Sequence, residues 1–124
     1  MSKTLTDRES DIMQVLWDRG PCRVSDVRAA LKDPLAHNTV LTMLGILEEK
    51  GFVRREADGR GHRYFVLIPE KDARKSAVRH LVRKLFRGSS ELLFTHLVSE
   101  QRLSPAQAKR LQQLLQEVSD EDRS

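Results

Sequence analysis

Residues 38–67 read NTVLTMLGILEEKGFVRREADGRGHRYFVL, and this stretch decides the fold. Its first part, up to Lys50, places apolar residues at three- and four-residue spacing, which predicts a helix with one buried face. Gly51 follows at the position where a left-handed glycine commonly ends a helix. The second part has two β-prone runs around a Gly-rich turn at residues 57–61, the pattern of a β-hairpin. The sequence therefore predicts a helix that leads directly into a hairpin.

Two further helices are predicted on the N-terminal side of this stretch. Thr6-Asp7-Arg8-Glu9 has the form of a capping box, and the amphipathic helix that it opens should stop at Gly20-Pro21. Ser25 is a candidate N-cap for a second, shorter helix, and Val24 before it is expected to add a short third strand. The order helix, short strand, helix, helix, hairpin predicts a winged helix-turn-helix domain over residues 1–68.

A different composition begins at Pro69, and residues 69–124 are predicted to form three helices. Gly88-Ser89-Ser90 should separate the first from the second. Ser104-Pro105-Ala106-Gln107 is another capping box, with proline at the first helical position. The predicted fold class is thus mainly α: an α+β winged helix-turn-helix with a C-terminal three-helix dimerisation region.

Pairing of two subunits is inferred from the apolar faces of these C-terminal helices. The faces are broader than so short a segment can bury alone, so we expect self-association, although the same residues could also pack only within their own chain. The side chains expected at the subunit interface are Leu81, Leu85, Leu92, Leu93, Phe94, Leu97, Leu111 and Leu115.

Composition and motif content exclude several classes of protein. The single cysteine, Cys22, excludes an internal disulfide framework and a Cys-rich metal site. The histidines lack metal-ligand spacing, and no phosphate-binding loop, dinucleotide fingerprint or nucleophile elbow is present, so we expect no metal, no cofactor and no enzymatic activity. No apolar run approaches a membrane span, and the N-terminus lacks a signal-peptide pattern, so a cytoplasmic location without membrane insertion is expected.

Charge and side-chain size point to double-stranded DNA as a partner. The net charge is +4, and the outward face of the helix before the hairpin is short and polar, as a helix in the major groove requires. Basic residues on the hairpin can reach a phosphate backbone or a minor groove. Two other interpretations stay open: Asn38 or Thr39 only caps the helix, and the basic residues form a solvated surface. The predicted DNA-binding residues are His37, Asn38, Thr39, Thr42, Lys50, Arg55, Arg60, His62 and Arg63.

Six motifs together resemble the penicillinase repressor (BlaI/MecI/CopY) family. They are LTDRE (5–9), IMQVLW (12–17), NTVLTML (38–44), LEEKG (47–51), GRGHRY (59–64) and LS (103–104). The resemblance implies a winged-helix homodimer that represses its target genes by binding a palindromic DNA operator. The alternative, which the fold alone allows, is a protein-interaction module that uses the winged helix as a docking surface without binding DNA.

The resemblance also implies ways of releasing the DNA. In the β-lactam-responsive branch a membrane-bound sensor protease is the partner, and the repressor is cleaved at an Asn-Phe bond that aligns with His96-Leu97 here. The copper-responsive branch has a Cys-rich tail, whereas this tail is acidic and lacks cysteine. Relatives often carry arginine at the position of Gly45. The residues that define the inducing signal in these two branches differ in this chain. The sequence therefore does not identify the signal.

Overall fold

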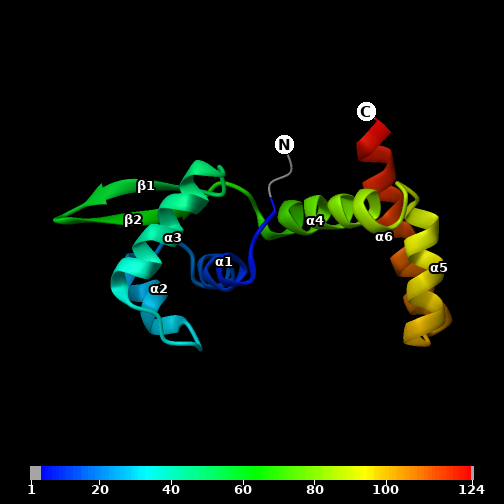
Figure 1. Cartoon of the computed structure of the whole chain (residues 1–124), viewed down its shortest axis with the longest axis horizontal. Coiled ribbons are helices and arrows are strands. Elements are labelled where there is room, and N and C mark those ends of the chain that lie inside the picture. Colours follow the sequence, from blue (N-terminus) through cyan, green and yellow to red (C-terminus); the bar gives the residue numbers. More distant parts are fainter. Residues whose placement is uncertain (1–3, 124) are drawn as a thin grey trace. The chain divides into compact units, whose positions relative to one another are not determined.

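The computed structural model describes residues 4–123, with the side chains of these residues except 101 and 118–123. The elements follow in the order α1 (Asp7–Arg19), α2 (Val24–Ala30), α3 (His37–Glu49), β1 (Val53–Asp58), β2 (Gly61–Val66), α4 (Glu70–Leu85), α5 (Ser90–Gln101) and α6 (Pro105–Arg123), as labelled in Figure 1. The chain divides within α4 into two compact units, one ending at Ala73 and the other beginning at Arg74.

The N-terminal unit is a winged helix, as predicted. The capping box that opens α1 is present: Thr6 Oγ accepts from the Glu9 amide, and the Glu9 carboxylate accepts from the Thr6 amide. Gly20 ends α1 with a φ of +85°. In the wing, β1 and β2 pair antiparallel from Val53 opposite Val66 to the hairpin tip, and the ribbon projects past α3 in Figure 1.

The wing turns through a two-residue loop. Asp58 pairs with Gly61, which leaves Gly59 and Arg60 as the loop residues. Gly59 has a φ of +64°, the region that a two-residue hairpin of type II′ requires at its first loop position. The loop therefore presents the Arg60 side chain at the far end of the wing.

The segment before α2 pairs with the wing only through an isolated bridge at Cys22, so the prediction of a short third strand at Val24 is wrong. The amide and carbonyl of Cys22 exchange hydrogen bonds with those of Tyr64 in β2, at 3.2 and 2.8 Å. Val24 is instead the first residue of α2, because Arg23 is the N-cap and the Asp26 carboxylate accepts from the Arg23 amide. Ser25 is therefore inside the helix and is not its cap.

One apolar core joins the three helices of this unit to the wing. It is formed by Ile12, Met13, Val15, Leu16, Cys22, Val27, Val40, Leu44, Leu47, Phe52, Val53 and Tyr64. The α3 helix contributes Val40, Leu44 and Leu47, all 0% exposed, so one face of this helix is fixed against the core. The opposite face points to solvent.

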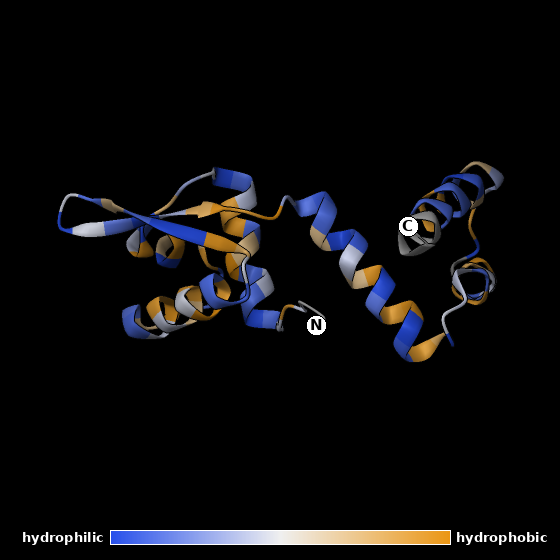
Figure 2. Ribbon diagram, turned by 90° about the horizontal axis from the view of Figure 1, so that it is seen from above, coloured by the Kyte–Doolittle hydropathy of each residue, from blue (hydrophilic) through white to orange (hydrophobic). Residues whose placement is uncertain are grey.

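The C-terminal unit has a smaller core within one chain. Val82 of α4, Leu93 of α5 and Leu115 of α6 are buried together. The second capping box is confirmed, since Ser104 and Gln107 exchange hydrogen bonds at the start of α6. Apolar and hydrophilic residues are interspersed along α4 in Figure 2. The predicted fold class, mainly helical with a two-stranded wing and three C-terminal helices, is confirmed.

Candidate nucleic-acid interface

The outward face of α3 carries short polar side chains that do not cap the helix. Ala36 is the N-cap residue, in extended conformation and without a side-chain capping hydrogen bond. The interpretation that Asn38 or Thr39 caps this helix is therefore wrong, since both lie inside its first turn and are exposed. His37 and Thr42 are exposed as well. These four side chains can reach a molecule outside the protein.

Leu41 belongs to the same outward face and was not among the predicted site residues. It is 41% exposed and lies three residues after Asn38, which places the two on one side of the helix. The exposure of Leu41 could have been predicted from the sequence, because Leu41 falls outside the buried stripe formed by Val40, Leu44 and Leu47. An aliphatic group at such a position can contact the methyl group of thymine.

A cleft of about 190 Å³ lies between α3 and the wing. Its lining includes His37 and Leu41 of α3, Arg23 before α2, and Gly61 and His62 of β2. The fold thus brings together two of the predicted residues, His37 and His62, that are 25 positions apart in the sequence.

The wing tip carries exposed basic groups. Arg60, in the loop, is exposed and makes no hydrogen bond or ion pair with any residue that the structure describes. His62 is exposed on β2. Arg55 is exposed on β1, and its Nε lies 3.7 Å from Glu48 Oε1. Their roles in DNA binding stay predictions.

Lys50, also predicted to contact DNA, has partners inside the protein. Its Nζ donates to Glu9 Oε1 at 2.7 Å and to the Thr4 carbonyl at 3.0 Å. Glu9 is only 3% exposed. Burial raises the pKa of Glu9, but the hydrogen bond from Lys50 and those from Thr6 outweigh this, so the pKa is lowered overall. Lys50 therefore neutralises a buried carboxylate.

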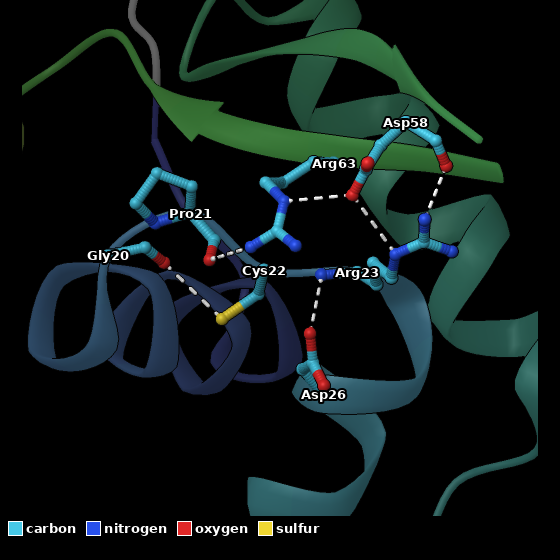
Figure 3. Close-up of polar contacts among 7 residues, drawn as sticks. All are labelled: Gly20, Pro21, Cys22, Arg23, Asp26, Asp58 and Arg63. Carbon is cyan, nitrogen blue, oxygen red and sulfur yellow. Dashed lines mark hydrogen bonds and ion pairs between the residues drawn. The ribbon is translucent and has the colours of Figure 1, made fainter.

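Three charged residues form a cluster at the end of the wing, drawn in Figure 3. Asp58 Oδ2 accepts from Arg23 Nε at 3.1 Å and from Arg63 Nε at 3.0 Å. Arg23 Nη2 also donates to the Asp58 carbonyl, and Arg63 Nη1 donates to the carbonyl of Pro21 at 3.4 Å. The hydrogen bond from Arg63 and the charge of Arg23 lower the pKa of Asp58. We name these residues the Asp58 cluster.

Arg23 was not predicted as a site residue. It lies 35 positions before its partner Asp58, and neither residue belongs to a motif that signals the pairing. Only the packing of the Cys22 segment against β2 brings Arg23 to the wing.

Cys22 is a buried thiol that donates to the Gly20 carbonyl at 3.3 Å. Burial, followed by the negative charge of Asp26, raises its pKa. The guanidinium of the adjacent Arg23 is directed to Asp58 (Figure 3). These surroundings favour the neutral thiol and oppose the thiolate that redox chemistry requires.

The predicted dimerisation residues fall into two groups. Leu93 and Leu115 are buried inside the single chain, and Phe94, Leu97 and Leu111 pack partly buried against them. Three others are exposed: Leu81 at 38%, Leu85 at 67% and Leu92 at 48%. The first group forms the intrachain core, and the role of the exposed group in a subunit interface stays a prediction.

The predicted cleavage region, His96-Leu97, lies inside α5. The imidazole of His96 is 5.8 Å from the ring of Phe86, and Leu97 packs against the small core. Cleavage at this bond would require α5 to unwind locally.

The described residues form neither a membrane-spanning helix nor a cluster of metal ligands. None of their helices is both long and apolar enough to cross a membrane. They also contain no group of three His, Cys, Asp or Glu side chains arranged to hold a metal ion.

Comparisons with known proteins identify the family. The model of the penicillinase repressor family matches residues 5–117. The uncharacterized 16.5 kDa protein in the ptsI 3' region of Latilactobacillus sakei is 29% identical over 113 residues, 90% of this chain and 77% of the relative. The methicillin resistance regulatory protein MecI of Staphylococcus aureus is 20% identical over 113 residues, 90% of this chain and 92% of MecI.

Among solved structures, a MarR family protein from Bacillus stearothermophilus is similar with a TM-score of 0.47 and 22% identity, over 97% of this chain and 76% of that chain. The fold assignment rests on the helices and strand pairing described above. The family match spans nearly the whole chain, and the family is one of transcriptional repressors, not of enzymes, whose members bind DNA operators as dimers. The chain belongs to the penicillinase repressor (BlaI/MecI) family and is a winged-helix transcriptional regulator.

Proposed function

We propose that this chain is a cytoplasmic repressor that binds a palindromic operator as a homodimer and blocks transcription by occupying the promoter. In each subunit α3 enters the major groove of one half-site, and the wing contacts the neighbouring backbone. The observation that carries the proposal is the outward face of α3, where His37, Asn38, Thr39 and Thr42 are exposed and none serves as the N-cap.

The residues divide by role. Asn38, Thr39 and Thr42 are short enough to let the helix backbone approach base edges, so they read or frame bases. Arg55, Arg60, His62 and Arg63 hold the phosphate backbone, with Arg60 exposed in the loop at the end of the wing. We leave Lys50 out of this set because its ammonium group neutralises the buried Glu9.

The test selects binding sites from a pool of random-sequence DNA duplexes with the full chain. An inverted repeat is expected, with half-site centres about one helical turn, 10–10.5 base pairs, or a multiple of it apart. Binding to the selected duplex should weaken steeply as salt rises, by about 0.9 log units per phosphate contact for each log unit of salt. A chain that retains no duplex even at low salt would contradict the proposal and favour the protein-interaction module.

Two substitutions separate base reading from backbone contact. Thr42→Ala should weaken binding to the selected duplex by about 1–3 kcal/mol and leave binding to a scrambled duplex nearly unchanged. Arg60→Ala should weaken binding to both duplexes. Fluorescence anisotropy measures both. If the two variants lose affinity equally on both duplexes, Thr42 is not a specificity residue.

A further inference from the structure

Arg23 lines the cleft between α3 and the wing, so a ligand bound in this cleft would contact its side chain. The guanidinium binds Asp58 through one edge, with Nε on the carboxylate and Nη2 on the backbone carbonyl. Its third nitrogen, Nη1, takes part in neither contact. A Cβ placed on Gly61 would lie 3.2 Å from this Nη1, so the missing side chain of Gly61 leaves the space beside it open.

The cluster keeps a positive charge despite its carboxylate. Asp58 contributes −1 and the two arginines contribute +2, which leaves +1 at the end of the wing. Arg23 and Arg63 remain 39% and 41% exposed at their side chains, so neither is removed from solvent by the pairing. An arginine whose planar group is already held in one orientation loses less conformational freedom when it binds an anion.

The other walls of the cleft suit a phosphodiester group. His37 and His62 supply N–H donors from α3 and β2, and Leu41 adds an apolar side chain to the lining. The cleft lies between the two elements that the proposed function places on DNA, the helix in the groove and the wing on the backbone. A DNA strand that borders the occupied groove would pass over it.

We infer that this cleft binds one phosphodiester group of the DNA backbone through Arg23, and that Asp58 is the positioning residue that holds Arg23 in place. Arg63 supports Asp58 from the other side, anchored on the Pro21 carbonyl. The inference rests on the proposed function, since the phosphodiester belongs to the DNA that the chain binds. Asp58 would then be an acidic residue that strengthens the binding of a polyanion.

The direction in which one substitution changes the affinity for DNA tests this directly. Asp58→Asn keeps the shape of the side chain and removes its negative charge. If Asp58 acted only through charge, the variant would bind DNA more tightly. Because Asp58 positions Arg23, we expect binding to a mixed-sequence duplex to weaken about tenfold, with a salt slope lower by about 0.9 per lost contact.

Two matched arginine variants separate the effect of losing the phosphate contact of Arg23 from the effect of losing one positive charge. Arg23→Gln and Arg8→Gln each remove one positive charge and one arginine–aspartate pair, since Arg8 Nη1 lies 3.0 Å from Asp33 Oδ2. Arg8 is on α1 and does not line the cleft. We expect the Arg23 variant to lose affinity as Asp58→Asn does, and the Arg8 variant to stay close to the unsubstituted chain.

A third variant fills the cleft and keeps every charge. Gly61 does not need a positive φ, so Gly61→Val is compatible with the strand while its side chain displaces Arg23 Nη1. We expect weaker binding with an unchanged midpoint of thermal unfolding, which separates displacement of Arg23 from loss of the fold. This variant and the arginine pair decide the question if Asp58→Asn does not fold.

Some outcomes would overturn the inference. Equal or tighter binding by folded Asp58→Asn, equal effects of the two arginine variants, or unchanged binding by Gly61→Val would each do so while the unsubstituted chain still binds DNA. Absence of binding by the unsubstituted chain would instead refute the proposed function.

Discussion

Glu9 illustrates how one residue can link the beginning of α1 to the end of α3. Its carboxylate accepts from the Thr6 amide, which fixes the first turn of α1, and from Lys50 at the end of α3. The side chain is 3% exposed, so removal of either partner would leave a polar group of the N-terminal unit without its hydrogen bond. The helix that carries the candidate base-reading residues is tied to α1 by this pair.

Replacement of Glu9 by glutamine should lower the free energy of unfolding by about 1–3 kcal/mol at neutral pH, because the hydrogen bond from Lys50 then has an uncharged acceptor. The pKa of Glu9 is lowered in the folded protein, so its ionisation stabilises the fold above the ordinary glutamate value of about 4.3. This stabilisation is lost as the pH falls through the lowered pKa, and the difference between the two proteins should shrink there.

Urea titration followed by the fluorescence of Trp17 measures this effect, since the chain's one tryptophan lies in α1 of the same unit. Glu49→Gln is the matched control, because Glu49 is exposed on α3. A difference between the Glu9 variant and the unsubstituted protein that does not depend on pH would contradict the assignment of the charge to this pair.

At the scale of elements, local sequence signals predicted most of the fold. The capping boxes at Thr6 and Ser104 are present, and so is the hairpin around Gly59. Each depends on residues within a few positions of one another, so the sequence contains the whole signal. Prediction failed at the start of α3, because the polar Asn38 is a better N-cap by residue type than Ala36, which is the N-cap in the structure.

The sequence predicted less of the candidate site than of the fold. The exposed face of α3 follows from helical periodicity, and Thr42 was placed on it correctly. By contrast, the contacts of Lys50 with Glu9 and of Arg23 with Asp58 span 41 and 35 residues. Such pairs depend on how the helices and strands pack, so they cannot be predicted from composition and residue spacing.

The helical state of α5 predicts where a protease cuts. Thermolysin cleaves before leucine, and among such bonds in the C-terminal unit two can be compared directly, His96-Leu97 within a helix and Arg102-Leu103 outside one. The first lies inside α5, whereas the second lies in the connection to α6, where Arg102 has a φ of +48°. We expect cleavage before Leu103 to precede cleavage before Leu97, because connections are cut more readily than regular helices.

Mass spectrometry of timed digests measures the order of these two cuts. If the bond before Leu97 were cut first, α5 would open more readily than its connection. The rearrangement that family-type cleavage at His96-Leu97 demands would then be intrinsic to the chain.

At the scale of the whole molecule, the exposed leucines indicate how the proposed subunit pairing could be broken without unfolding the chain. Leu85 is 67% exposed and Leu93 is 4% exposed. Leu85→Glu should therefore yield folded monomers, whereas Leu93→Glu should unfold the C-terminal unit by placing a charge in its core. Sedimentation velocity measures the mass, and circular dichroism measures the helix content of each variant.

A Leu85→Glu variant that keeps the dimeric mass expected of the unsubstituted protein would show that this part of α4 lies outside the subunit interface. A dimer that dissociates should also lose affinity for the inverted repeat more than for a single half-site, because the two winged helices then bind independently.

The small core of the C-terminal unit has a consequence for the lifetime of the protein in the cell. Only Val82, Leu93 and Leu115 are buried together there among the described side chains, so an unpaired chain opens at low free-energy cost. Opened segments are substrates for intracellular proteases, and turnover follows the population of the open form. In the proposed dimer, pairing would then protect each copy from degradation, and unpaired chains would be removed first. Abundance of the regulator would thus be limited by its own assembly.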